Sequence, residues 1–359
     1  MVGYCRWSAR LLSDYASSFL PAVNGVVFVR SAENRAAQEK TPERPTFTQM
    51  KPYEELDKGS QLRRFRAPAM SLLEAYPLDI ERVTPLVHLE NTTFRVDAAE
   101  GRFVLQIKRP FRSRRQVLSE MTWLDDLANA GFDGLPVPLR NNSGDLVSVF
   151  SGRGIPAERF AVLYRWVAGR FYFRGARSVH FRRLGELAAG LHRFSSTYSS
   201  PSGFERRDLG WSRPGVAGEL SRRLDVLLES TDLEERDRQT FAEAGTVIRE
   251  RTIALSDRSD HGLIHADLHL HNVLFIDGRA RAIDFDDCGF GDFAQDLGTT
   301  LWYLRNSSRF DEFYEALLEG YRSGREASDR FRQLVILYRH ARTIDMANWF
   351  VTRRDNPEI

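Results

Sequence analysis

The chain has 359 residues, and its 51 basic and 49 acidic residues leave a formal net charge of only +2. This balance indicates no polyanionic partner such as nucleic acid. Two distant cysteines give no disulfide framework, and no apolar run reaches membrane-spanning length. We therefore expect a cytoplasmic protein with substantial cores, and the composition leaves its oligomeric state open.

The first fifty residues show little periodicity. Residues 33–45 are polar and contain two prolines, as is typical of a linker. We expect residues 1–50 to be a poorly ordered N-terminal extension. From residue 51 the pattern becomes regular, and the spacing of apolar residues predicts a helix over Gln61–Tyr76, interrupted by Pro68.

A small antiparallel sheet is predicted next. Alternation between Leu86 and Lys108 is typical of three strands joined by short turns. Apolar residues at spacings of three and four then predict a helix over Ser113–Ala130. The apolar run Phe160–Val167 predicts a buried strand that ends this unit.

The remainder of the chain is mainly helical by pattern. Phe181–Phe194 is amphipathic, and further helices are expected in residues 216–255, 297–304, 310–321 and 330–350. The predicted fold class is α+β. It has an antiparallel-sheet N-lobe over residues 51–167 and a larger, mainly helical C-lobe over residues 168–359.

A β-hairpin is predicted within the C-lobe. Two short apolar strands, Val273–Ile276 and Ala280–Ile283, flank Asp277-Gly278, and Asp-Gly strongly favours a two-residue hairpin turn. Because antiparallel strands fold back on each other, the residues at the two ends of the hairpin lie side by side. These residues are Asn272 and Asp284.

Oxygen-bearing side chains gather around this hairpin. Asp267 lies in the preceding loop, so two carboxylates and the Asn272 amide share a small volume. Hard oxygen ligands of this kind suit Mg²⁺, and we expect Asn272 and Asp284 to bind it. Asp286 could reach a second metal ion or cap the following turn.

Two motifs in this region resemble those of kinases. His265-Ala266-Asp267 with Asn272 keeps the H-x-D-x-x-x-x-N spacing, and IDFDD at residues 283–287 stands in place of D-F-G. The set resembles the aminoglycoside phosphotransferase and choline kinase branch of the protein-kinase-like fold. Within it, the set is nearest to type II homoserine kinases and bacterial stress-response kinases. The family pattern is close to HGDLHxxNxL, and this chain departs at Ala266, where glycine is usual, and at Leu270-His271, where Pro-Gly is common.

The resemblance implies a two-lobe kinase fold with ATP between the lobes. The implied reaction is Mg²⁺-dependent transfer of the γ-phosphate to a hydroxyl of a small molecule (an aminoglycoside, choline or a homoserine-like compound) or of protein Ser or Thr. Asp267 would accept the hydroxyl proton, Asn272 and Asp284 would hold the metal, and His265 would support the loop.

The resemblance also implies phosphate contacts in the N-lobe. A basic side chain on the third strand should face the α- and β-phosphates. The family run VLKxxRP puts Gln106 there, but alternation places Lys108 on the same face, and we favour Lys108 because it carries charge. Glu120 is its expected partner, although it could be a solvated helix charge. Asn91 and Thr92, in the turn over the phosphates, could bind them or be ordinary turn residues.

Two other classes of function remain open. Four of the eight histidines, His261, His265, His269 and His271, crowd one segment, and a zinc-dependent hydrolase could use them. That reading leaves the hairpin and the IDFDD run unexplained. An ATP-binding pseudokinase without turnover is the second alternative, because the basic residue on the third strand is uncertain.

Overall fold

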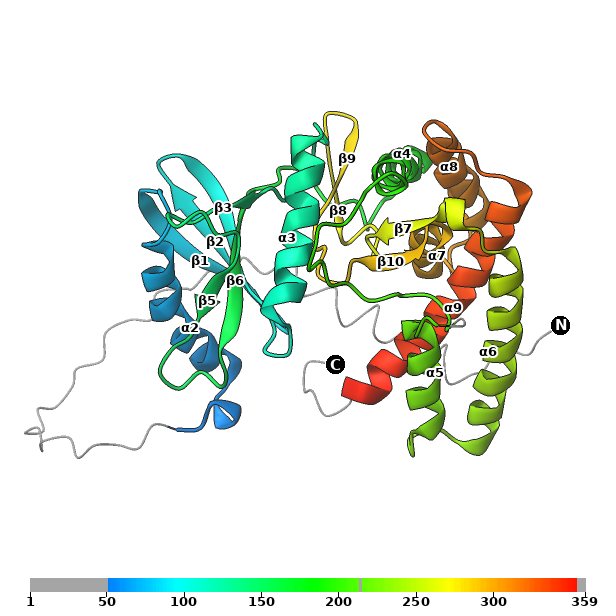
Figure 1. Ribbon diagram of the computed structural model, residues 1–359, viewed down its shortest axis with the longest axis horizontal. Helices are drawn as coiled ribbons and strands as arrows, with labels where there is room; N and C mark the ends of the chain where they lie inside the picture. Colours follow the sequence, from blue (N-terminus) through cyan, green and yellow to red (C-terminus); the bar gives the residue numbers. More distant parts are fainter. Residues whose placement is uncertain (1–50, 213–214, 354–359) are drawn as a thin grey trace, which may run out of the picture.

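The computed structural model describes residues 51–212 and 215–353, so the extension predicted for residues 1–50 lies outside the described chain. The first lobe is built on one antiparallel sheet with strand order β1-β2-β3-β6-β4, and β5 also pairs with β6 (Figure 1). Its strands are β1 (Ile80–His88), β2 (Thr92–Ala98), β3 (Gly101–Ile107), β4 (Pro138–Leu139), β5 (Ser148–Phe150) and β6 (Arg159–Arg165).

Helix α2 (Lys58–Leu73) packs on this sheet and confirms the helix predicted around Pro68. Asp57 caps its N-terminus by accepting a hydrogen bond from the backbone of Ser60. Phe65 is fully buried and stacks on Phe150 of β5, with ring centroids 5.5 Å apart. This contact closes the core of the N-lobe between helix and sheet.

Helix α3 (Arg114–Asn129) lies between the sheet and the C-lobe hairpin (Figure 1). Ser113 and Gln116 form a capping box at its start, so the helix begins at Arg114, one residue after the predicted start. Its apolar face belongs to the core cluster of the C-lobe, and Trp123 meets Phe285 edge-on at 5.6 Å. The helix therefore connects the two lobes by packing.

The C-lobe is mainly helical, as predicted. Helix α9 packs against α5, α6 and α7, and α4 packs along α8. The helices are α4 (Ser178–Ser195), α5 (Glu219–Glu229), α6 (Glu235–Leu255), α7 (Ala294–Tyr303), α8 (Phe310–Arg322) and α9 (Asp329–Arg353). Across the described ranges, none of the helices is long and apolar enough to cross a membrane.

Two small strand pairs flank the two sequence motifs of the C-lobe. Strand β7 (His261–Ile264) pairs with β10 (Gly289–Asp292), and β8 (Val273–Ile276) pairs with β9 (Arg279–Ala282). The second pair is the predicted hairpin, with β9 starting one residue earlier than expected. Its turn residues both have positive φ, 51° and 72°, as the Asp-Gly dipeptide predicted.

Candidate active site

A buried carboxylate positions the loop His265–Asn272. Asp296, in the first turn of α7, accepts the backbone N–H of His265 at 3.0 Å and that of Ala266 at 2.7 Å. The ring of His192 on α4 lies 3.0 Å from the same carboxylate. All three contacts are buried, so they fix the start of the loop firmly. Our sequence reasoning did not assign this role to Asp296.

The backbone at Ala266 is left-handed, with φ of 69°. Glycine adopts this conformation without the steric cost that the Cβ of alanine brings, which explains why glycine is usual at this position in the resembling family. His265 beside it is fully buried, packs against Phe285 at 4.5 Å, and lies 3.0 Å from the carbonyl oxygen of Ile283. These contacts hold the His265 ring beneath the loop.

Asp267 sits at the centre of a set of hydrogen-bond donors. The Asn272 amide donates to its Oδ2 at 2.9 Å, His269 Nε2 lies 3.2 Å from the same oxygen, and Arg342 of α9 donates to Oδ1. Burial opposes the charged carboxylate, but His269 and Arg342 outweigh it and hold the pKa of Asp267 well below its usual range. Asp267 is therefore ionised at neutral pH.

Asn272 and Asp284 lie at the two ends of the hairpin. The N–H of Ile283 donates to the Asn272 carbonyl oxygen at 2.9 Å, which brings the two ends together. Since the amide nitrogen of Asn272 points at Asp267, its amide oxygen is left to face a ligand. Asp284 is exposed, yet the surrounding protein limits its hydration. The loss of hydration and the negative charge of the Asp286 carboxylate raise the pKa of Asp284 to about 7.

This donor set fits magnesium better than zinc. A crowded carboxylate with a raised pKa gains from a nearby cation, and Mg²⁺ typically takes one or two protein oxygens and completes its shell with phosphates and water. Over residues 51–212 and 215–353, no three His, Cys, Asp or Glu side chains gather as a metal site.

The four histidines of the crowded segment do not converge on one point, although the rings of His269 and His271 are in contact, with centroids 5.4 Å apart. His261 lies 3.8 Å from Asp208, whereas His265 is buried below the loop. His271 stacks on Phe173, with centroids 4.9 Å apart. The ring of His269 lies 3.2 Å from the Asp267 carboxylate, whereas His265 contacts only the backbone N–H of Asp267, so the geometry gives no support to a zinc hydrolase.

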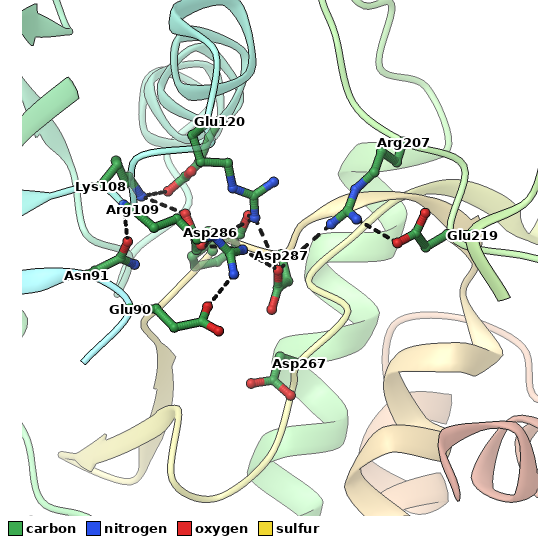
Figure 2. Close-up of polar contacts among 12 residues, drawn as sticks. Glu90, Asn91, Lys108, Arg109, Glu120, Arg207, Glu219, Asp267, Asp286 and Asp287 are labelled. Carbon is green, nitrogen blue, oxygen red and sulfur yellow. Dashed lines mark hydrogen bonds and ion pairs between the residues drawn. The ribbon is translucent and has the colours of Figure 1, made fainter. Parts of the chain in front are cut away.

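Lys108 is the buried cation next to the hairpin. Its Nζ lies 2.8 Å from Glu120 on α3 and 3.3 Å from Asp286, as Figure 2 shows. Burial disfavours the charged amine, but the two carboxylates outweigh it and raise the pKa of Lys108. Glu120 also accepts hydrogen bonds from Tyr164 at 3.1 Å and Arg206 at 3.0 Å. The expected pairing of Lys108 with Glu120 is thus present.

The other predicted phosphate-binding residues have different surroundings. Gln106 is half-buried on β3 and takes no part in the Lys108 cluster. The side chain of Asn91 accepts the backbone N–H of Arg109 at 2.9 Å. Thr92 is fully buried, with its hydroxyl 2.9 Å from a ring nitrogen of His88. Both turn side chains therefore stabilise the turn itself.

Arginines surround the acidic run that follows Asp284. Arg109 and Arg112, between β3 and α3, lie 2.8 and 3.2 Å from the carboxylate of Asp286. They also contact Asp287, at 3.0 and 3.1 Å (Figure 2). Burial opposes the charge on Asp286, but Lys108 and these arginines hold its pKa far below the usual range. In this structure Asp286 joins the two lobes electrostatically.

Comparisons with known proteins agree on one family. The sequence profile of the phosphotransferase enzyme family (APH) matches residues 82–334. Amicoumacin kinase of Bacillus subtilis (strain 168) is 25% identical over 283 residues, which cover 74% of this chain and 80% of that protein. Homoserine kinase of Parvibaculum lavamentivorans is 26% identical over 253 residues, covering 65% of this chain and 68% of that protein.

Solved structures share the fold. Amicoumacin kinase hAmiN, in complex with AMP-PNP, Ca²⁺ and Ami, has a TM-score of 0.64 at 20% identity, over 84% of this chain and 97% of that one. A microcompartment-associated aminopropanol kinase has a TM-score of 0.61 at 22% identity, over 82% and 98% of the two chains. These likenesses confirm the expected two-lobe α+β fold.

Proposed function

The chain belongs to the phosphotransferase enzyme family, and on this basis we propose that it transfers the γ-phosphate of ATP, with Mg²⁺, to a hydroxyl of a small-molecule acceptor. The observation that carries the proposal is the meeting of Asp267, Asn272 and Asp284 around one hairpin. The buried Lys108–Glu120 pair lies on the N-lobe side of the same site. These are the parts that phosphoryl transfer requires.

The N-lobe side would hold the nucleotide. Lys108 is kept charged and in place by Glu120, so a phosphate oxygen near it would gain a fixed cation without the cost of ordering a flexible side chain. Asn272 and Asp284 would hold Mg²⁺, which neutralises charge on the phosphates when bound. The complex of hAmiN with AMP-PNP and Ca²⁺ supports a nucleotide bound together with a divalent ion.

The C-lobe side would hold the acceptor. Asp267 is ionised and fixed by three donors, so it can orient a hydroxyl by accepting its hydrogen bond. As the new O–P bond forms, the hydroxyl proton passes to this carboxylate. The relatives are named for small-molecule acceptors, which favours such an acceptor over protein Ser or Thr.

Replacing Asp267 tests this function. ATP consumption would be measured against a panel of hydroxyl metabolites and antibiotics. Asp267→Asn keeps the shape but removes the basic oxygen, so we expect kcat with the active acceptor to fall about a hundred- to ten-thousand-fold. Binding of Mg-AMP-PNP should change little. Asp277→Asn, in the hairpin turn, is the matched control and should keep wild-type activity. An Asp267→Asn enzyme that turns over at the wild-type rate would sink the proposal.

A further inference from the structure

An arginine from the last helix reaches the carboxylate that should meet the acceptor. Arg342, on α9, donates to Oδ1 of Asp267 and lies 2.6 Å from Oδ2 of Asp345. Its side chain is 15% exposed, and its Nε is buried without a hydrogen-bond partner in the described part of the chain. The protein thus places its own guanidinium where a cationic acceptor would direct an ammonium group.

The second carboxylate on this face is also neutralised. Asp345 accepts from Arg342 through one oxygen and from Arg223 through the other. Arg223 in turn lies 3.1 Å from Glu219 on α5. An ammonium group entering here would have to displace a guanidinium and remain close to another. Like-charge contact of that kind disfavours binding by several-fold or more.

Rings form a wall beside Asp267 without adding negative charge. His269 lies over Tyr303 with centroids 4.0 Å apart, and His271 stacks on Phe173. A compact carbon skeleton can lie on such a wall while its polar end meets Arg342.

We propose that Arg342 binds an acidic group of the acceptor, so that the acceptor is a small hydroxylated carboxylate or phosphate ester. This inference rests on the function proposed above. A planar guanidinium binds carboxylate or phosphate through two parallel hydrogen bonds. When the acidic group engages Arg342, Oδ1 of Asp267 is released to accept the hydrogen bond of the acceptor hydroxyl. The aligned hydroxyl oxygen then attacks the γ-phosphorus of ATP. The bond between this phosphorus and ADP breaks, and the hydroxyl proton passes to Asp267.

Matched probes separate charge from shape. We would titrate 4-hydroxybutyrate, 4-hydroxybutyramide, 4-amino-1-butanol and 3-hydroxypropyl phosphate, by calorimetry, into the protein with and without saturating Mg-AMP-PNP. At least one anionic probe should bind more tightly than the amide and the amine. The carboxylate and phosphate arms show which acid is preferred. Arg342→Gln should weaken the binding of that anion about ten- to hundredfold, the range for losing a charged hydrogen bond.

Two further variants keep the test decisive. Arg342→Lys retains a positive charge beside Asp267 and Asp345, but it cannot form the paired hydrogen bonds, so anion binding should fall to an intermediate value. Arg339→Gln removes an arginine of α9 that instead lies over Phe310, and it should change nothing.

Three results would overturn the proposal: tighter binding of 4-amino-1-butanol than of the anions, equal anion affinity in Arg342→Gln, or no binding of either anion. Failure of Mg-AMP-PNP to bind would instead count against the proposed function. The titrations without nucleotide would still decide the role of Arg342.

Discussion

Gln106, near the end of β3, and Lys108, directly after the strand, differ in what they offer a phosphate. Lys108 is enclosed by Glu120 and Asp286, whereas Gln106 is half-buried and uncharged. The family pattern places its cation at the Gln106 position, and Lys108, two residues further along the chain, stays our prediction for the phosphate contact. Because successive residues of one face are two apart, both positions point to the same side of the sheet.

Replacing each residue by methionine, which has a similar volume, should show which of the two side chains contributes more to ATP binding. Lys108→Met keeps the volume but removes the charge, so we expect the apparent KM for ATP to rise about ten- to hundredfold, as for the loss of one charged hydrogen bond. Gln106→Met should raise it less. The measurement is initial rate against ATP concentration with the active acceptor. The opposite ranking would assign the phosphate contact to Gln106.

The candidate site was predictable only where its residues are close in sequence. The spacing of Asp267 and Asn272, and the turn before Asp284, were sufficient to predict that these three side chains lie close together. Arg342 and Asp296 were not predicted, because each lies on a helix whose sequence pattern shows it only as one charged residue among several. No local pattern indicates which charge on a helix will face a loop far away in the chain.

At the scale of elements, local signals predicted structure well. The Asp-Gly turn appeared at the expected residues, because turn chemistry acts over a few positions, and α3 began one residue after the start that its apolar spacing predicted. Strand β1 was predicted too short. It begins at Ile80, and it contains Pro85 and two irregularities in pairing, which disrupt the alternation expected of a strand. Its position at the edge of the sheet tolerates these features.

The contact of α4 with α8 depends on two glycines. A Cβ at Gly320 would overlap the carbonyl oxygen of Arg182, and one at Gly185 would overlap that of Leu317. Because the obstacle is backbone, no side-chain rotation relieves it. We expect Gly320→Ala to lower the free energy of unfolding by about 3 kcal/mol.

Urea unfolding measures this loss. The transition midpoint should fall while its slope stays constant. Gly59→Ala, at an exposed position in the first turn of α2, is the control and should be neutral or slightly stabilising. Equal midpoints for Gly320→Ala and wild type would show that α4 and α8 can move apart enough to accommodate a Cβ at no cost in stability.

Across the whole molecule, packing and charge join the lobes. Helix α3 shares its apolar face with the C-lobe core, and Arg109 and Arg112 pair with Asp286 and Asp287. Figure 2 shows the charges alternating onward to Arg207 and Glu219. The sequence indicated balanced charge but not this pairing, because ion pairs between distant segments depend on tertiary structure.

Glu219 gives this network a measurable pH dependence. Burial alone would raise its pKa, but Arg222, Arg207 and Arg223 outweigh burial and lower it from 4.5 to about 2. A depressed pKa contributes stability that is full above about pH 4.5 and is lost as the pH falls towards 2. Wild type should therefore exceed Glu219→Gln in unfolding free energy by about 1–3 kcal/mol at pH 7.

Urea unfolding at a series of pH values tests this assignment. The difference between Glu219→Gln and wild type should shrink between pH 4.5 and 2. A difference that is independent of pH would show that Glu219 acts by shape alone.

The central claim is that the two ends of the hairpin bind a metal together with the nucleotide. Calorimetry of AMP-PNP binding, with Mg²⁺ and with EDTA, compares wild type with Asp284→Asn. Asparagine tolerates the left-handed backbone found at residue 284, where φ is 64°, so the variant removes charge without changing shape. We expect wild-type affinity to fall at least tenfold in EDTA and Asp284→Asn to show weak binding that no longer responds to Mg²⁺. Equal, Mg²⁺-dependent affinity in both proteins would contradict the account.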